Sequence, residues 1–314
     1  MSVVRKTKVI AIACSDIHLS SKAPIWRTNE PDWFEAMKRP LQELHKLKIK
    51  YNCPIFCAGD IFDQWNSSAE LINFALENLP NDIYAIAGQH DLPLHNLENI
   101  KQSAYWTLVK AGKIINIEKD FSIKLPQYKI KLYGFPFNVK FKKCHDKEEG
   151  YKHIAIIHNY YWIKGKSYKK ALESDRIFNN KEIFTSYDIV IIGDNHKSFK
   201  VKYKSAMHKT TIFNCGGFMR RKSDEINHKP QVGLIYNNGE IEPYTLDTSL
   251  DKFLNIDIKD NKEEEKFDMT RFIKELENLD YKIFDFREAI EIYLKKNKIN
   301  KYIKQIILES MEKK

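Results

Sequence analysis

The sequence predicts a layered α/β fold, because short apolar runs alternate with stretches of helical spacing. The runs are rich in β-branched residues, as buried strands are, and span residues 9–14, 55–58, 83–87, 154–157 and 189–192. Four of the five runs stop at a Gly or Ser, and each is followed by an Asp, His or amide residue. In layered α/β proteins, ligands and catalytic groups lie beyond the carboxyl ends of such strands.

Two helices are expected between the first three runs. The first begins near residues 30–33, where Glu-Pro-Asp-Trp is typical of a helix start. Its apolar residues recur at helical spacing at Phe34, Met37, Leu41, Leu44 and Leu47. Ser67 and Ser68 can cap the second helix. The apolar face of this second helix consists of Leu71, Phe74, Ala75 and Leu79.

Further strands are expected later in the chain, over residues 121–136, 210–214, 232–236 and 240–246. Asn237, Asn238 and Gly239 separate the last two strands and are a strong hairpin signal.

The character of the sequence changes after Asp247. Residues 260–265 form a charge run typical of a linker, and helical patterns follow over residues 267–279, 285–296 and 299–312. We therefore expect a catalytic α/β domain over residues 1–248 and a small helical C-terminal segment over residues 249–314. The C-terminal helices either dock on a partner or pack back on the catalytic domain.

Composition excludes several classes of protein. A chain of 314 residues with 43% hydrophobic residues can bury a substantial core and is not a disordered protein. Its five cysteines are an odd number and form no C-x-x-C pair, which favours reduced thiols without a structural zinc module. No apolar stretch is long enough to span a membrane, and the first run is too short for a signal peptide. We expect a cytoplasmic protein of a bacterium or of a phage-infected host.

The net charge of +10 lies entirely within residues 1–250, because acidic and basic residues balance in residues 251–314. A basic catalytic body favours a polyanionic partner such as nucleic acid, since phosphate contacts release counterions. The alternative is a Lys-rich solvated surface without a specific partner.

The residues after the five runs have the chemistry of metal ligands: Asp16 and His18, Asp60 and Asp63, Gln89 and His90, His158, and Asp194 and His196. Carboxylates and imidazoles in one pocket suit Mn²⁺, Fe²⁺ or Zn²⁺ better than Mg²⁺. A single carboxylate, Asp60, could bridge two ions about 4 Å apart. Each cluster alone is more often a turn or a helix cap, but the ordered set predicts a two-metal site.

These clusters also carry a family resemblance. The order D-x-H, G-D-x-x-D, G-N-H-[DE], a lone His and G-H-x-H is the signature of the calcineurin-like metallophosphoesterases, which this chain resembles over about residues 8–240. The resemblance implies a four-layer α/β/β/α sandwich of two packed sheets flanked by helices, here with the small helical C-terminal appendage. It also implies two divalent metal ions, with Mn²⁺ favoured and Mg²⁺ or Fe²⁺ as alternatives.

The resemblance implies a role for each matching residue. The first metal would be held by Asp16, His18, Asp60 and His196. The second would be held by Asp60, Gln89, His158 and Asp194. His90 would protonate the leaving group, and Asp63 would orient His90.

Two positions depart from the family pattern. Gln89 stands where the family usually has Asn, and Asp194 where it usually has His. Both keep an oxygen donor, so we expect a working second site with a stronger bias to Mn²⁺ or Mg²⁺ over zinc. A second site that fills only with substrate remains an alternative.

Within the family, the chain looks most similar to the SbcD-like DNA repair exonucleases. The similarity lies in residues 214–225 and 229–233, which resemble a G-S-x-x-R-x-x-x-x-E segment after the last metal motif. It implies DNA as substrate, with Arg220 and Arg221 as DNA-binding residues, an SMC-like ATPase subunit of the SbcC type as partner, and a homodimer. The alternative is a surface turn with solvated arginines.

A basic aromatic loop over residues 160–166 also favours nucleic acid. Its Lys164 and Lys166 could hold phosphates, while Tyr161 and Trp162 either stack on bases or belong to the core.

The preferred function is therefore a metal-dependent DNA phosphodiesterase, exo- or endonucleolytic, in repair, recombination or replication. A small-molecule or protein phosphatase of the same fold is the alternative. A non-catalytic scaffold is disfavoured, because it has no use for a proton donor such as His90 and its partner Asp63.

Overall fold

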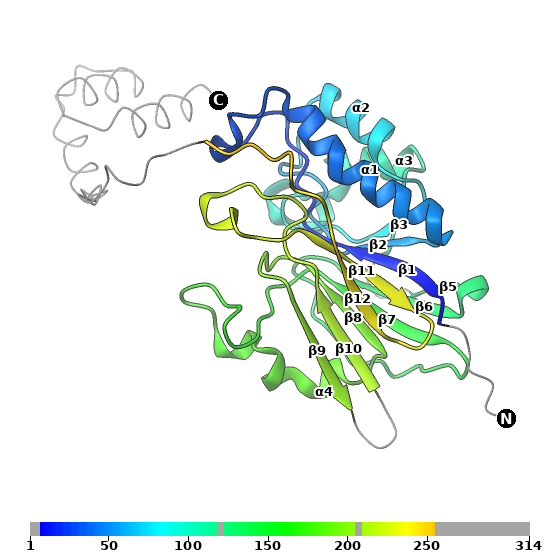
Figure 1. Cartoon of the computed structure of the whole chain (residues 1–314). Helices are drawn as coiled ribbons and strands as arrows, with labels where there is room; N and C mark the ends of the chain where they lie inside the picture. Colours follow the sequence, from blue (N-terminus) through cyan, green and yellow to red (C-terminus); the bar gives the residue numbers. More distant parts are fainter. Residues whose placement is uncertain (1–6, 119–121, 205–208, 255–314) are drawn as a thin grey trace, which may run out of the picture. The chain divides into compact units, whose positions relative to one another are not determined.

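The computed structural model describes residues 7–118, 122–204 and 209–254. The chain divides into two units, residues 1–254 and 255–314, and the described residues all belong to the first. This unit contains two six-stranded mixed sheets that pack face to face (Figure 1). The helical patterns expected after residue 260 lie outside the described residues, so the proposed domain division at residue 248 stays a prediction.

The first sheet has the strand order β12-β11-β1-β2-β3-β4. Its strands are β1 (Val9–Cys14), β2 (Ile55–Cys57), β3 (Ile83–Ala85), β4 (Ile114–Asn116), β11 (Gln231–Tyr236) and β12 (Ile241–Thr245). Strands β1 to β4 are parallel, and β11 and β12 extend the sheet in antiparallel pairs. The hairpin expected at Asn237 to Gly239 is confirmed: Gly239 has φ +83° and donates its N–H to Tyr236 O.

The second sheet has the order β5-β6-β7-β8-β10-β9. Its strands are β5 (Ser122–Leu125), β6 (Ile130–Phe135), β7 (Lys152–Ile157), β8 (Ile189–Ile192), β9 (Phe199–Lys204) and β10 (Lys209–Asn214). Strands β6, β7, β8 and β10 are parallel, whereas β5 and β9 are antiparallel edges.

Helices α1 (Trp33–Tyr51), α2 (Ala69–Asn78) and α3 (Ala104–Lys110) cover the outer face of the first sheet (Figure 1). The two expected helix starts are confirmed, since Asp32 and Ser68 accept hydrogen bonds from the main-chain N–H groups of Glu35 and Leu71. The short helix α4 (Lys181–Phe184) lies beside the second sheet. Short 3₁₀ turns span Ile25–Arg27, Pro93–His95, Leu97–Gln102, Pro126–Tyr128, Glu173–Asp175, Ile177–Asn180 and Ser223–Glu225.

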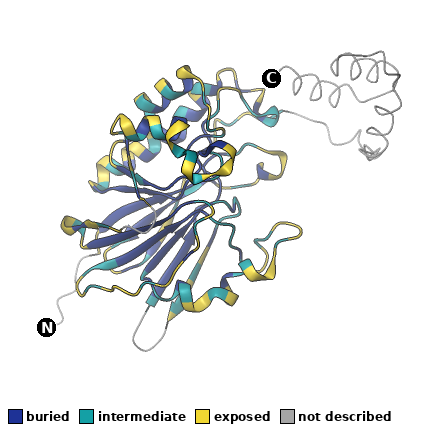
Figure 2. Cartoon of the chain, turned by 180° about the vertical axis from the view of Figure 1, so that it is seen from behind, coloured by how far each residue is buried: buried dark blue, intermediate teal, exposed yellow. Residues whose placement is uncertain are grey.

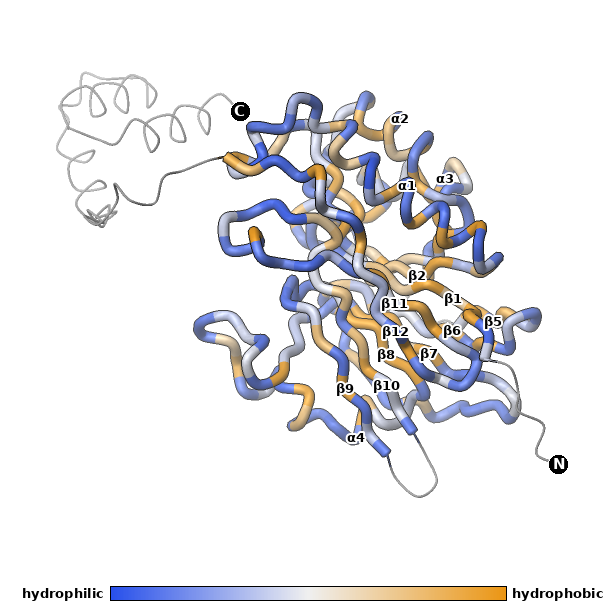
Figure 3. The backbone as a smooth tube through the Cα atoms, viewed as in Figure 1, coloured by the Kyte–Doolittle hydropathy of each residue, from blue (hydrophilic) through white to orange (hydrophobic). Residues whose placement is uncertain are grey.

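Burial on both faces explains why the strands are apolar throughout. In β1, Ile12 and Cys14 pack with the helices, whereas Ala11 and Ala13 face the second sheet. The inner strands of both sheets are buried (Figure 2) and hydrophobic (Figure 3), whereas the edge strands β5, β9 and β12 are partly exposed. The predicted sandwich of two sheets with flanking helices is confirmed.

Some elements escaped prediction. Helices α3 and α4 and strand β4 are short, and β9 alternates with exposed lysines as an edge strand does. The five cysteines, all within the described residues, are free, and their reduced state stays a prediction. Among the described residues, no helix has the length and apolar character that a membrane crossing requires.

Candidate metal centre

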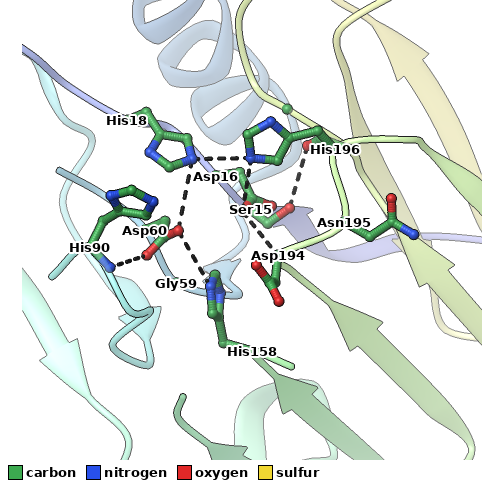
Figure 4. Close-up of polar contacts among 12 residues, drawn as sticks. Ser15, Asp16, His18, Gly59, Asp60, His90, His158, Asp194, Asn195 and His196 are labelled. Atoms are coloured by element: carbon green, nitrogen blue, oxygen red, sulfur yellow. Dashed lines mark hydrogen bonds and ion pairs between the residues drawn. The ribbon is translucent and has the colours of Figure 1, made fainter. Parts of the chain in front are cut away.

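The carboxyl ends of parallel strands from both sheets bring the predicted ligands together (Figure 4). Strands β1, β2 and β3 lead into loops that carry Asp16, His18, Asp60, Gln89 and His90. Strands β7 and β8 lead to His158, Asp194 and His196. Side chains up to 180 positions apart in the sequence thus face one another, as the sequence pattern predicts.

Main-chain hydrogen bonds join the first two loops. Asp16 N donates to Gly59 O and His18 N to Asp60 O, both at 3.0 Å. Asp16, His18 and Asp60 have φ between +51° and +54°, a left-handed conformation that costs a non-glycine residue about 1–2 kcal/mol. Such strain persists where the surrounding structure enforces it, which is common at functional sites.

Two glycines allow the loops to approach each other. A Cβ on Gly88 would overlap the Asp60 carboxylate, and one on Gly193 would overlap the Ala58 carbonyl and the His158 ring. The glycines of the G-Q-H and G-D-N-H clusters are therefore required by packing around Asp60 and His158, and not only by turn geometry.

The first ligand set consists of Asp16, His18 and His196, whose ligand atoms all lie within 4.8 Å of one another. The Nε2 atoms of His18 and His196 are 3.2 Å apart, and His196 Nε2 lies 3.8 Å from Asp16 Oδ1. His18 Nε2 is also 3.8 Å from Asp60 Oδ2, which brings the fourth expected ligand beside the set.

The second set centres on Asp60 and His158. Their Oδ2 and Nε2 atoms are 3.4 Å apart, and with Asp16 they form another group within 4.8 Å. The two residues that depart from the family pattern lie here as well: Gln89 Oε1 is 2.6 Å from His158 Nε2, and Gln89 Nε2 donates to Asp194 Oδ1 at 2.8 Å. Gln89 therefore turns its oxygen toward the ligand cluster.

Each imidazole has its Nδ1 atom beside an acceptor outside the cluster. His18 Nδ1 is 3.4 Å from Asp63 Oδ1, His158 Nδ1 is 2.5 Å from Ala58 O, and His196 Nδ1 is 3.2 Å from Glu225 Oε1. When Nδ1 carries the proton and donates to that acceptor, Nε2 presents a lone pair to the cluster. This is the usual arrangement of metal-binding histidines.

The donor set fits divalent cations. Asp16 Oδ2 and Asp60 Oδ2 are buried without a hydrogen-bond partner, and each such atom costs about 1–3 kcal/mol. The Nε2 atoms of His18 and His196 lie 3.2 Å apart. When both imidazoles carry their proton on Nδ1, the two Nε2 lone pairs face each other, which is unfavourable unless a cation lies between them. Cations bound by these atoms would remove both penalties.

Burial dominates the ionisation of the cluster. It raises the pKa of the Asp16 carboxyl to about 6 and lowers the pKa of the His18 imidazole to about 4. Burial also acts to raise the pKa of Asp60, but the nearby His158 outweighs it and holds that pKa well below its usual range. A divalent cation favours carboxylates and neutral imidazoles, so it would suit all three groups.

His90, the expected proton donor, is held at two points. Its main-chain N–H donates to Asp60 Oδ1 and its Nδ1 to the main-chain carbonyl of Asp63, each at 2.9 Å. The family resemblance implied that Asp63 orients His90, and the two residues are in contact. The contact is made by the Asp63 main chain, however, while its carboxylate faces His18 and Arg221.

Asp91 was not singled out from the sequence. Its buried carboxylate accepts hydrogen bonds from the main-chain N–H groups of Ile61, Phe62 and Gly88. It thereby fixes the Asp60 loop against the His90 loop. Burial, with a contribution from the Asp60 charge, raises the pKa of Asp91 to about 7.

Glu225 was also missed as a site residue. It follows β10, which is parallel to β8, and its Oε1 faces His196 Nδ1. Its Oε2 accepts the main-chain N–H groups of Arg221 and Lys222 at 2.6 and 3.0 Å. Burial acts to raise the pKa of Glu225, but the hydrogen bond to His196 outweighs burial and lowers this pKa to about 2. The sequence had pointed to this segment for its arginines, and the glutamate of the same motif is what touches a ligand.

The structure separates the two arginines that the sequence analysis assigned to DNA. Arg220 donates to Asp251 Oδ2, Ile226 O and Thr248 O at 2.8–2.9 Å, so its guanidinium joins two loops of the protein. This arrangement does not favour phosphate binding by Arg220, and we correct that expectation. Arg221 lies at the metal centre, with Nη2 2.8 Å from Asp63 Oδ1.

The basic aromatic loop is partly a core element. Trp162 is buried and donates Nε1–H to Leu172 O, and Tyr161 packs edge-on against Phe184. For these two aromatics the core alternative is therefore the correct one. Lys164 is exposed and Lys166 half-buried.

The comparison with protein families agrees with this geometry. The sequence profile of the family described as Calcineurin-like phosphoesterase matches residues 11–284. No curated protein matches the chain. A similar solved structure is the 5'-nucleotidase from Candida albicans SC5314, with 12% identity and a TM-score of 0.46. The similarity covers 78% of this chain and 55% of that one.

Substituting Asp60→Asn should abolish binding of two ions, because the shared carboxylate is lost from both ligand sets. Metal content after dialysis against Mn²⁺, measured by plasma mass spectrometry, checks this. Asp82→Asn, at an exposed carboxylate on the surface, is the matched control. Two ions bound by Asp60→Asn at unchanged affinity would rule out Asp60 as the shared ligand.

Substituting Asp91→Asn should lower the free energy of unfolding by about 1–3 kcal/mol, because an amide cannot accept all three buried N–H groups. Urea denaturation of the metal-free protein measures this effect. A variant as stable as the unsubstituted protein would show that the carboxylate is not what holds the two loops together.

Proposed function

Because the chain belongs to the calcineurin-like phosphoesterase family, it is a metal-dependent hydrolase of phosphoester bonds, and we propose that its substrate is DNA. The proposed activity is that of an exo- or endonuclease in repair, recombination or replication. The described residues support a division of roles between metal ligands and a proton donor.

The residues that would hold two divalent ions are Asp16, His18, Asp60, Gln89, His158, Asp194 and His196. Bound there, such ions polarise a phosphoryl group and lower the pKa of a water molecule that attacks it. His90 has its Nδ1 proton fixed on Asp63 O, so its Nε2 can carry a proton to the leaving oxygen. Its main-chain bond to Asp60 Oδ1 holds this donor beside the shared carboxylate.

One observation supports the choice of DNA: lysines from two separate loops lie near the candidate ligand His196 and near His228. Lys222 is close enough to His196, and Lys166 to His228, for its charge to oppose a proton on the imidazole. His228 is itself tied to the same region, with Nε2 2.8 Å from Gly217 O. Positive charges on two sides of the centre suit a substrate with several phosphates.

The basic aromatic loop, residues 160–166, is hydrogen-bonded to the loop that carries His196. Asn195 is buried and donates its Nδ2–H groups to Tyr161 O and Lys166 O, both at 2.9 Å. Lys197 Nζ donates to Ser167 O at 2.8 Å. Phosphates held by Lys164 and Lys166 would therefore have a fixed position relative to the metal ligands, which suits contacts that position a DNA backbone.

The finer parts of the proposal rest on sequence. Mn²⁺ is the proposed metal, since Gln89 and Asp194 supply oxygen where the family usually has Asn and His. The resemblance of residues 214–233 supports an SMC-like ATPase subunit as partner and a homodimer as the assembly. Five free cysteines support a reducing, cytoplasmic compartment.

Substituting His90→Asn should reduce hydrolysis about 10²–10⁴-fold while metal binding is retained, because a positioned proton donor is lost. Hydrolysis of linear DNA and Mn²⁺ content are measured on the same preparation. His45→Asn, an exposed histidine on α1, is the control. Loss of metal in His90→Asn would place His90 among the ligands, a role its proximity to His18 and Asp60 permits.

The double substitution Lys164→Ala, Lys166→Ala should weaken DNA binding and reduce the slope of log affinity against log salt by about 2, since two phosphate contacts are lost. Hydrolysis of bis-p-nitrophenyl phosphate should be unchanged. The control is the double substitution Lys46→Ala, Lys50→Ala on α1, which removes the same charge at positions distant in sequence from residues 160–166. Unchanged DNA binding, with a small phosphoester as the better substrate, would favour the phosphatase alternative.

A further inference from the structure

We propose that Arg221 is a positioning residue that links the two imidazoles of the first ligand set through two carboxylates. The inference rests on metal binding at this centre and not on DNA as the substrate. It assigns Arg221 a role other than the phosphate contact expected from the sequence.

The first branch runs through the Arg221 side chain. Its Nη2 lies 2.8 Å from Asp63 Oδ1, and the same oxygen faces His18 Nδ1 at 3.4 Å. The guanidinium therefore holds the carboxylate that the His18 Nδ1 atom faces.

The second branch runs through the Arg221 main chain. The Arg221 N–H donates to Glu225 Oε2 at 2.6 Å, and Glu225 Oε1 faces His196 Nδ1 at 3.2 Å. The Lys222 N–H shares Oε2 at 3.0 Å, so Glu225 is held by two consecutive peptide groups. This branch fixes the His196 ring.

The two branches close a ring of contacts. The Nε2 atoms of His18 and His196 lie 3.2 Å apart and complete the ring. A shift of Arg221 would move both carboxylates and, with them, both ring orientations. Since partners of ligating histidines typically contribute 10–100-fold to metal affinity, one residue that serves two of them should have a large effect.

Arg221 is suited to this role because it is itself immobilised. Its side chain is only 12% exposed. The preceding carbonyl, Arg220 O, accepts a hydrogen bond from Arg27 Nη1 at 2.5 Å, and the Arg220 guanidinium is bound to Asp251. Arg27 is 2% exposed and also contacts Glu30, so the anchor is a buried charged cluster.

A substrate-binding role makes a different prediction. An arginine that only contacts phosphate affects the KM for substrate and leaves metal affinity unchanged when no substrate is present. A positioning arginine affects metal affinity with no phosphate in the solution. Calorimetric titration of the metal-free, full-length protein with Mn²⁺, without nucleic acid, therefore separates the two roles.

We expect Arg221→Gln to weaken the tightest Mn²⁺ site about 10–100-fold. Arg221→Lys, which keeps a cation beside Asp63 without the planar fork, should lie between Arg221→Gln and the unsubstituted protein. Arg176→Gln is the matched control, since Arg176 is partly exposed and pairs with Glu173. Far-ultraviolet circular dichroism verifies that each variant is folded. If Arg221→Gln does not fold, the Mn²⁺ affinity of Arg221→Lys decides the test.

A double-mutant cycle tests the linkage itself. Asp63→Asn and Glu225→Gln should have non-additive effects on Mn²⁺ affinity when Arg221 is present, and additive effects in the Arg221→Gln background. Unchanged Mn²⁺ affinity in Arg221→Gln and Arg221→Lys, with a raised KM for bis-p-nitrophenyl phosphate, would overturn the proposal. Failure of the DNA proposal would leave these titrations unaffected, because they contain no substrate.

Discussion

The structure of this centre depends on the buried carboxylate of Asp60. One oxygen accepts the His90 N–H, and the other faces His18 and His158 without a hydrogen-bond partner of its own. Removing a carboxylate from water is costly, so its place at the junction of two sheets requires positive charge nearby. Asp60 adopts a left-handed conformation, Gly88 leaves room for its carboxylate, and the Nε2 atoms of His18 and His158 face it.

Much of this could be predicted from the sequence, because strand ends are a local property. An apolar run followed by Gly-Asp specifies a buried strand and then a polar group at its end, and parallel strands place such groups at one edge of a sheet. That reasoning located Asp16, Asp60, His158 and His196 correctly at one centre. It also located α1 and α2, whose caps at Asp32 and Ser68 are local signals.

The residues that escaped prediction act through contacts between loops. Asp91 holds a loop that begins 30 positions earlier, and Glu225 holds a histidine 29 positions away. A periodic sequence pattern does not reveal contacts between residues about 30 positions apart. Arg220 is a residue for which the sequence predicted the wrong contact. Its place in a basic segment favoured an anionic ligand, but its guanidinium pairs with Asp251 of the same protein. Charge composition predicts the sign of a partner but not whether that partner is internal.

The cluster around Arg27 adds a constraint that neither the strands nor the metal ligands impose. Asp251 accepts hydrogen bonds from Arg27 and Arg220, and Leu254 N donates to Trp26 O. The Phe253 ring lies 5.2 Å from the guanidinium carbon of each of these arginines. The last described residues before position 255 are thus bonded to the loop that continues into Arg221 and Glu225. Buried ion pairs contribute little net stability but strongly penalise the loss of one member. One set of interactions therefore connects the last described residues with His196. Asp251 pairs with Arg220, and the next residue, Arg221, donates to the Glu225 carboxylate that faces His196.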